Sequence, residues 1–267
     1  MDKFYLWGVM HYQHKKQFGQ HFLKDAEVIH QTIHLLKEKY PSGIVLEVGP
    51  GMGVLTEQLV QEKAYTLFIN EIDRDLLPVL IQKFHQIPQR QWLPGDFLQI
   101  SLEALGNHYA LIGNFPYNIS TQIVFRMLEE RMRIPVAVGM FQKEVGERLA
   151  APPGSKTYGI TSVLTQAYYQ VTLHIHIPPS SFQPPPKVDS VVLRMERLPE
   201  ENWPVCGFEP LRKVVKAAFG QRRKTLRNAL KGMTFHGIPS DDPIWNLRAE
   251  RLSVKDFTRL ALAQMKS

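Results

Sequence analysis

Hydrophobic and polar positions follow two periods along residues 26–196 of this chain. Short apolar runs, which are typical of buried strands, alternate with segments in which apolar residues recur at helical spacing. We expect helices at 26–39, 54–62 and 74–84, and strands at 44–48, 65–70, 91–93, 109–113 and 135–141. This alternation predicts an α/β fold with a mostly parallel sheet.

Two later segments, 169–177 and 188–196, show the every-second-residue alternation of antiparallel strands. We expect them to form a hairpin-like pair at the end of the sheet. His174 and His176 fall on one face of the first strand, where a place on the sheet surface is a better interpretation than metal binding.

The pattern changes after residues 200–204, where helical spacing begins over 211–219 and 222–230. We therefore predict three parts: an N-terminal extension at 1–14, a sheet domain at 15–198 and a small helical domain at 205–267. The extension is too polar, and its apolar runs are too short, for a signal peptide or a membrane span. A flexible tail and a misplaced start remain alternatives for it.

Composition indicates a soluble intracellular protein with a polyanionic partner. The 267 residues are 44% hydrophobic, enough for a full core and one appended domain. The net charge of +7 and the pI near 9.4 favour nucleic acid, and RNA is the simplest choice. Cys206 stands alone and the ten histidines show no metal-ligand spacing, so we expect neither disulfides nor a metal.

A glycine-rich turn follows the first predicted strand. Gly49, Gly51 and Gly53 alternate with other residues and lead into a helix, as in loops that let a nucleotide-type cofactor approach the backbone. Close packing alone would also explain such a turn. The next strand ends at Glu71, about 20 residues on, where a ribose ligand is found in such folds.

Two further strand ends carry groups suited to an adenine. Asp96 can accept a hydrogen bond from an exocyclic amine while Phe97 packs nearby, although a turn or helix-capping role is more common for Asp. Asn114 can accept through its side-chain oxygen, Pro116 fixes the turn, and Tyr117 can stack on a ring. The alternative for this segment is a plain strand end, turn and helix start.

Taken together, these motifs resemble the ribosomal RNA adenine dimethyltransferases, which use S-adenosylmethionine. The similarity extends over almost the whole chain from about residue 14, in order and in spacing. It is carried by Gln20-His21-Phe22-Leu23, Leu46-Glu47-Val48-Gly49-Pro50-Gly51, Asn70-Glu71-Ile72-Asp73, Gly95-Asp96-Phe97-Leu98, residues 114–120, 141–145, 151–159, 182–190 and 222–228.

The later segments resemble most the branch of the family that acts on the small ribosomal subunit. That resemblance implies dimethylation of two adjacent adenines near the 3′ end of small-subunit (16S) RNA, a role in assembly of the 30S particle, a cytoplasmic location and a monomer. It also implies a cofactor site made of His21, Leu23, Gly49, Gly51, Glu71, Ile72, Asp96, Phe97 and Asn114.

Two residues depart from the family pattern, which often has Asn in place of His21 and Leu in place of Phe115. Neither change removes a necessary group. His21 keeps a polar ring that can reach the cofactor, although an ordinary loop histidine is the alternative, and Phe115 contributes its backbone carbonyl whatever its side chain.

The expected catalytic residues are Asn114, Phe115, Tyr117 and Phe182. The Asn114 oxygen and the Phe115 carbonyl would accept both amine hydrogens of the adenine, so that its lone pair faces the transferable methyl group. Tyr117 and Phe182, which lies within the stiff Pro-rich segment 178–187, would stack on the two faces of the flipped base. A buried Phe under a surface loop is the alternative for Phe182.

Six cations lie between residues 213 and 227 with no acidic residue among them, and we expect them to bind RNA phosphates. Lys216, Arg223 and Arg227 are expected near one helix face, with a solvated amphipathic helix as the alternative. The full set is Lys213, Lys216, Arg222, Arg223, Lys224 and Arg227.

Three other functions stay open on the sequence alone. A related enzyme that methylates large-subunit RNA shares the front motifs. A non-catalytic RNA-binding assembly factor or transcription factor could keep the fold without turnover, although Glu71, Asp96, Asn114 and Tyr117 are all present. A dehydrogenase is disfavoured, because no His or Lys suited to hydride chemistry stands near the strand ends.

Overall fold

The computed structural model describes residues 21–265, so the predicted extension at 1–14 lies outside the described residues. Internal contacts divide the chain into two units. Unit 1 comprises the residues up to 146 and 172–196, and unit 2 comprises 147–171 and the residues from 197 onward. This division groups residues 147–171 with the C-terminal helices, whereas the sequence pattern alone assigns them to the sheet domain.

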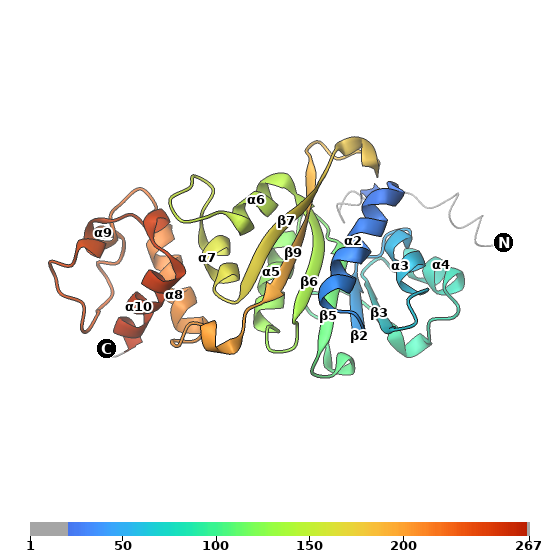
Figure 1. Ribbon diagram of the computed structural model, residues 1–267, viewed down its shortest axis with the longest axis horizontal. Coiled ribbons are helices and arrows are strands. Elements are labelled where there is room, and N and C mark those ends of the chain that lie inside the picture. The colour runs from blue at the N-terminus through green and yellow to red at the C-terminus, as the bar shows by residue number, and fades with distance from the viewer. Residues whose placement is uncertain (1–20, 266–267) are drawn as a thin grey trace. The chain divides into compact units, whose positions relative to one another are not determined.

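A seven-stranded sheet with the order β4-β3-β2-β5-β6-β9-β7 lies mostly in unit 1, with only the first residues of β7 and the last residue of β9 counted in unit 2 (Figure 1). The pairs β2–β3, β2–β5, β3–β4 and β5–β6 are parallel, and β6–β9 is antiparallel. The predicted α/β sheet is confirmed, and β7 and β9 are neighbours as expected. The strands are β2 (Gly43–Val48), β3 (Tyr65–Glu71), β4 (Trp92–Pro94), β5 (Tyr109–Asn114), β6 (Val136–Gln142), β7 (Tyr169–Ile177) and β9 (Ser190–Arg197).

The helices of unit 1 each bury an apolar stripe against this sheet or a neighbouring helix. Helix α2 starts where the Asp25 side chain accepts a hydrogen bond from the Val28 N–H at 3.3 Å, and it packs against β6 and α3. The main core gathers side chains from these helices and from the strands beneath them. The helices are α2 (Ala26–Lys39), α3 (Val54–Leu59), α4 (Leu76–Lys83) and α5 (Ser120–Glu129), and α6 (Lys143–Ala150) crosses the boundary between the units.

A second, two-stranded sheet joins distant parts of the chain. Strand β1 (Phe22–Leu23) pairs antiparallel with β8 (Phe182–Gln183), so that Leu23 lies opposite Phe182. The Lys24 N–H donates to the Ser181 carbonyl at 2.9 Å, and the Ser181 hydroxyl donates to the Asp25 carboxylate at 3.0 Å. These bonds attach the Pro-rich segment to the residues that precede α2.

Unit 2 is helical. Helix α8 packs against α7, α9 and α10, and the aromatic rings of Phe219 and Phe257 stack with centroids 5.8 Å apart. Its helices are α7 (Ile160–Gln166), α8 (Phe208–Gly220), α9 (Leu226–Ala229) and α10 (Val254–Met265). Short 3-10 turns connect the elements of both units: η2 (Gln89–Gln91), η3 (Glu103–Leu105), η4 (Pro179–Ser181), η5 (Glu200–Asn202), η6 (Pro243–Asn246) and η7 (Ala249–Arg251).

The expectation that Lys216, Arg223 and Arg227 share one helix face is wrong. Helix α8 ends at Gly220, a turn covers residues 221–224, and α9 has only four residues. Lys216 therefore lies on α8, Arg223 in the turn and Arg227 on α9. Glycine weakens a helix through its backbone entropy, which accounts for the break at this point.

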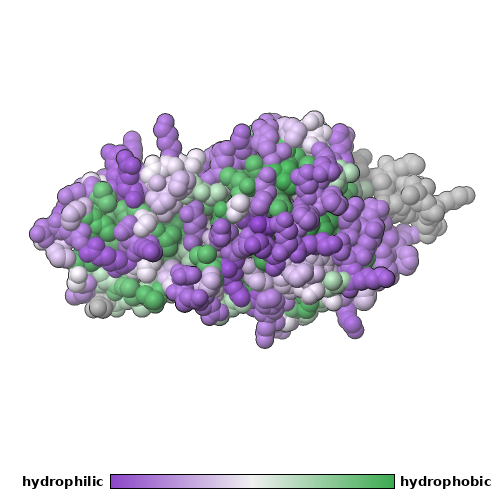
Figure 2. Space-filling model, in the orientation of Figure 1, coloured by the Kyte–Doolittle hydropathy of each residue, from purple (hydrophilic) through white to green (hydrophobic). Residues whose placement is uncertain are grey.

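The molecular surface is mainly hydrophilic on the face drawn in Figure 2, with hydrophobic residues in separate patches. Large apolar side chains that are exposed include Met132, Leu173, Val205 and Leu247, which are far apart in the sequence. Scattered exposure of this kind is ordinary for a folded protein. Within residues 21–265, every helix is too short or too polar to cross a membrane.

Candidate functional site

A cavity of about 260 Å³ opens at the carboxyl ends of β2, β3, β4 and β5 in unit 1. Because these strands are parallel, their ends meet at one edge of the sheet, where open α/β sheets bind their ligands. The cavity brings together every cofactor and catalytic residue expected from the sequence except Phe182. The expected residues that line it are His21, Leu23, Gly49, Gly51, Glu71, Ile72, Asp96, Phe97, Asn114, Phe115 and Tyr117.

The glycine-rich turn forms one wall of this cavity. Gly49, Gly51 and Gly53 all have positive φ angles, which side chains with a Cβ rarely adopt. A Cβ on Gly51 would also lie 2.8 Å from the ring of Phe22, another lining residue. The turn thus gives a ligand access to the backbone that a larger residue would obstruct.

Carboxylates stand at the ends of β3 and β4. Glu71 is 5% exposed and one of its oxygens accepts the Asp73 N–H at 2.7 Å, which fixes the orientation of the carboxylate. Asp96 accepts the Leu98 N–H at 2.9 Å, so it holds a turn as well as lining the cavity. Asp96 also accepts the Gln99 side-chain amide at 3.3 Å. Each carboxylate oxygen has two acceptor positions, so carboxylates at this edge suit a ligand that donates hydrogen bonds.

Between the carboxylates the cavity wall is apolar. Ile72 is 41% exposed although it follows a buried strand, whereas Phe97 is almost fully buried. An exposed Ile side chain at this edge, between the acceptor oxygens of Glu71 and Asp96, can pack against the face of a planar ring.

Asn114 is oriented by its amide nitrogen. The Nδ2 group donates to the His21 carbonyl oxygen at 2.8 Å, which turns Oδ1 to the opposite side of the amide plane. No donor among the described residues contacts Oδ1, so this oxygen can accept a hydrogen bond from a ligand. His21 is held in turn by its Nδ1–H, which donates to the Pro184 carbonyl at 2.9 Å.

The ring of Phe115 is buried in the core, where it meets Phe141 edge-on with centroids 5.3 Å apart. Space for the ring comes from Gly139 on the neighbouring strand, since a Cβ there would lie 2.1 Å from Phe115 Cε2. With its side chain packed inward, Phe115 is placed to contribute backbone atoms to the cavity.

Tyr117 lies with its ring stacked on His21 at 5.5 Å and an interplanar angle of 27°. Its hydroxyl shares a short hydrogen bond with the Ser190 hydroxyl. Burial raises the pKa of Tyr117, with the Ser190 bond acting in the other direction, so the phenol is neutral at physiological pH. The ring thus presents a fixed aromatic surface at the cavity.

Phe182 is buried rather than exposed for stacking, which is the alternative that the sequence left open. Its side chain is 1% exposed and belongs to the main core, and it does not line the cavity. A ring that stacks on a substrate base must be accessible, so the expected stacking role is not what this arrangement provides. Pairing of β8 with β1 directs Phe182 inward, and two-residue strands have no periodicity that would reveal this.

Glu47 is a charged residue that sequence reasoning did not single out. It is fully buried behind the glycine-rich turn, and one oxygen accepts the Thr56 hydroxyl at 2.7 Å while the other, Oε1, has no partner. Burial raises the pKa of Glu47 to about 7, and the nearby Glu71 charge adds to the increase. A carboxylate inside an apolar strand pattern was the available signal.

The sequence profile of the ribosomal RNA adenine dimethylase family matches residues 11–261. The chain belongs to this family. Among its relatives is the ribosomal RNA small subunit methyltransferase A of Cytophaga hutchinsonii, which is 47% identical over 244 residues, covering 91% of this chain and 94% of that protein.

Solved structures agree with this assignment to the dimethylase family. A dimethyladenosine transferase from Plasmodium falciparum superposes with a TM-score of 0.75 at 25% identity, over 92% of this chain and 98% of that one. The 23S rRNA methyltransferase ErmE superposes with a TM-score of 0.67 at 24% identity, over 91% and 99%, and shows the shared fold. The fold of this dimethylase is thus a Rossmann-like methyltransferase fold.

The six cations of the expected RNA-binding set are all exposed, and all lie in unit 2. Arg222 donates to the Lys156 carbonyl at 2.6 Å and Arg227 to the Ser240 carbonyl at 2.8 Å. The other four, Lys213, Lys216, Arg223 and Lys224, have no ion-pair partner within residues 21–265. Exposed, unpaired cations of this kind are free to neutralise phosphates.

Two of the segments that carry the sequence resemblance, 151–159 and 222–228, contact each other in unit 2. The Arg222 bond to Lys156 connects residues 222–228 to the loop 151–159, and the Gly154 N–H donates to the Glu250 carbonyl at 2.6 Å. Tyr158 of the same loop is buried against Phe219 of α8. In the described part of this dimethylase, no three His, Cys, Asp or Glu residues are grouped as metal ligands would be.

Proposed function

We propose that this protein is an S-adenosylmethionine-dependent enzyme that dimethylates the N6 amines of two adjacent adenines near the 3′ end of small-subunit (16S) ribosomal RNA. The observation that carries the proposal is the cavity in which Glu71, Asp96 and Asn114 come together at neighbouring strand ends. Membership of the adenine dimethylase family and the 47% identical small-subunit relative support it.

The cavity residues fit an adenosyl cofactor. Glu71 offers acceptor oxygens for the ribose hydroxyls, and Asp96 offers them for the adenine amine. Ile72 provides an apolar surface for the adenine ring. The glycine-rich turn lets the cofactor come close to the backbone. When bound, S-adenosylmethionine supplies a methyl group on a positively charged sulfur.

The protein's part in the reaction is to orient a weak nucleophile, because the lone pair of an adenine amine is delocalised into the ring. Asn114 Oδ1 and the Phe115 carbonyl accept the two amine hydrogens, which favours a pyramidal nitrogen whose lone pair faces the methyl group. Transfer of the methyl group to this nitrogen would leave a protonated amine, which would release its extra proton to solvent. The monomethylated amine keeps one N–H, so the second methylation requires it to turn in place or to rebind, and the pocket must leave room for the first methyl group.

The exposed cations of unit 2 are proposed to hold RNA phosphates, which places the target region without reading its sequence. We further propose that the enzyme acts as a monomer in the cytoplasm on assembling small subunits, and that it contributes to their biogenesis. The family relationship supports these points.

The deciding experiment supplies tritiated S-adenosylmethionine with undermethylated small subunits and, in parallel, with large-subunit RNA, and identifies the product nucleoside by mass. Dimethyladenosine in small-subunit RNA alone is the expected result. Label confined to large-subunit RNA would instead assign the activity of the related enzyme that methylates large-subunit RNA. Tight cofactor binding with no transfer to either substrate would indicate a non-catalytic assembly factor.

A further inference from the structure

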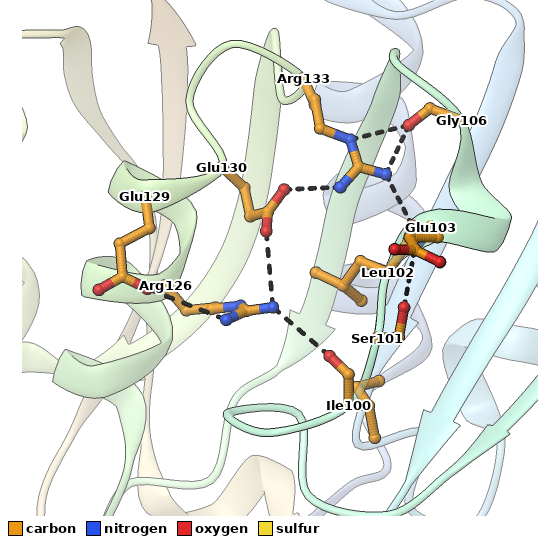
Figure 3. Close-up of polar contacts among 9 residues, drawn as sticks. All are labelled: Ile100, Ser101, Leu102, Glu103, Gly106, Arg126, Glu129, Glu130 and Arg133. Carbon is orange, nitrogen blue, oxygen red and sulfur yellow. Dashed lines mark hydrogen bonds and ion pairs between the residues drawn. The ribbon is translucent and has the colours of Figure 1, made fainter.

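Two arginines lie beside the loop that supplies Asp96 and Phe97 to the cavity (Figure 3). Arg126 belongs to α5, which follows the Asn114 segment, and Arg133 stands just before β6. The loop runs from the end of β4 at Pro94 to the start of β5 at Tyr109, and its only regular structure is the 3-10 turn Glu103–Leu105. All of these residues belong to unit 1.

The arginines donate hydrogen bonds to three carbonyls of this loop. Arg133 Nη2 donates to the Leu102 carbonyl at 2.6 Å, and its Nε donates to the Gly106 carbonyl at 2.8 Å. Arg126 Nη2 donates to the Ile100 carbonyl at 3.4 Å. A loop with so little secondary structure depends on side-chain donors of this kind to fix its backbone.

Glu130 holds the two guanidinium groups together. Its carboxylate lies 2.7 Å from Arg133 Nη1 and 3.5 Å from Arg126 Nη2 (Figure 3). The side chains of all three residues are between 18% and 24% exposed, so the ion pairs are partly shielded from water. We call Arg126, Glu130 and Arg133 the arginine bracket.

A short turn connects the arginine bracket to the part of the cavity that Asp96 and Phe97 line. The N–H groups of Gln99 and Ile100 donate to the Asp96 carbonyl at 2.9 and 3.0 Å. The turn is fixed at its other end by Asn70 of β3, whose Nδ2 donates to the Gly95 carbonyl at 2.9 Å. Asp96 is thereby held between Asn70 on one side and the bracket on the other.

We propose that the arginine bracket is a positioning device that sets the Asp96 carboxylate for the exocyclic amine of the cofactor's adenine. None of its three residues lines the cavity, so it acts through the loop backbone. The inference rests on the proposed use of an adenosyl cofactor. It adds side chains from α5, and from the segment between α5 and β6, to the residues that recognise the adenine base.

A positioning role and a purely structural role predict different outcomes when an arginine is removed. Loss of general stability would lower the melting temperature without changing which base the cavity prefers. Displacement of Asp96 would weaken the contact to the amine, and would therefore reduce discrimination against a base that carries a carbonyl oxygen in its place.

The test measures the dissociation constants of S-adenosylhomocysteine and S-inosylhomocysteine by calorimetry for the wild-type chain, Arg126→Gln and Arg133→Gln. We expect the preference of the wild type for the adenosyl compound to fall by about fivefold or more in both variants, the equivalent of weakening one hydrogen bond. Faster amide exchange at residues 98–106, with exchange in β2 and β5 unchanged, should accompany the loss.

Arg212→Gln is the matched control, because Arg212, like Arg133, pairs with a glutamate three residues before it in the chain, here at 2.6 Å, but lies in unit 2. It should keep the wild-type preference. If a glutamine variant does not fold, Arg126→Lys and Arg133→Lys retain the charge but not the forked geometry, and should show a smaller loss.

Unchanged preference in folded variants would overturn the proposal, as would a wild-type chain that binds both compounds equally. Failure of the wild type to bind S-adenosylhomocysteine at all is a separate result, which would overturn the proposed cofactor and with it the role of the bracket.

Discussion

Asn114 shows how a single side chain is prepared for its role by a contact outside the reacting atoms. Its amide nitrogen is occupied by the His21 carbonyl, so the orientation of its oxygen is fixed before a substrate arrives. An acceptor fixed in advance costs no reorganisation during the reaction, which is where such groups contribute most.

We therefore predict that Asn114→Ala lowers the turnover of methyl transfer by on the order of a hundredfold or more. Affinity for S-adenosylhomocysteine should change little, since Glu71 and Asp96 remain in place. Single-turnover transfer to undermethylated small subunits measures the rate of methyl transfer. Calorimetry measures the affinity for S-adenosylhomocysteine. Turnover equal to that of the wild type would refute the assigned role.

Glu47 should make the stability of the protein depend on pH. Its folded-state pKa of about 7 is above the ordinary value of 4.5, so the folded protein binds the proton more tightly than the unfolded chain does. Stability from this group is complete below pH 4.5 and is lost as the pH rises to about 7, by roughly 3 kcal/mol.

Glu47→Gln should remove this dependence, because Gln is neutral at every pH and can still accept the Thr56 hydroxyl. Urea unfolding between pH 5 and pH 8 is the measurement, and the variant should lose less stability over this range than the wild type. Glu57→Gln, which changes an exposed carboxylate next to Thr56, is the control. Parallel curves for the wild type and Glu47→Gln would contradict the prediction.

At the scale of elements, the segment that follows β5 is matched to strand β6 through Phe115 and Gly139. The aromatic ring occupies the volume that a side chain on Gly139 would need. The Phe115 ring therefore makes this chain depend on a glycine at position 139.

Gly139→Ala should destabilise the protein by about 1–3 kcal/mol, because the added methyl group overpacks the core. In a Phe115→Leu background the same substitution should cost less, since the smaller side chain leaves room. Thermal or urea unfolding of the four proteins in this cycle gives the coupling. Equal cost in both backgrounds would show that the ring is not the obstacle.

Most elements of the sheet could be predicted within one or two residues, because strand and helix periods are strong in residues 26–196. The strand-end residues of the site followed from that pattern, since parallel strands end at a common edge. Phe182, Glu47 and the break after α8 could not be predicted in the same way. The burial of Phe182 and Glu47 depends on pairing or packing between segments that are distant in the sequence. The break after α8 is a turn inside a segment whose apolar spacing is helical throughout.

At the scale of the whole molecule, the net charge of +7 gives the protein a general attraction to RNA. Association should therefore weaken with salt, with a slope set by the number of phosphates that are neutralised. The unpaired cations of the turn after α8 are placed to contribute to that number.

The double variant Arg223→Gln and Lys224→Gln should bind undermethylated small subunits more weakly. The slope of log affinity against log salt should become shallower by roughly 1 to 2. Binding of S-adenosylhomocysteine should not change. Lys63→Gln with Arg90→Gln removes the same charge from exposed positions of unit 1 and serves as the control. A wild-type salt slope in the first double variant would exclude these cations from the contact.

The link between His21 and Pro184 spans 163 positions of the chain. During synthesis the first wall of the cavity therefore emerges long before the segment that secures it, and β1 has no partner until β8 has been made. A nascent chain that already contains Gly51, Glu71 and Asp96 would still have an unfinished cavity. Capture of the cofactor should thus be among the last abilities that the growing polypeptide acquires.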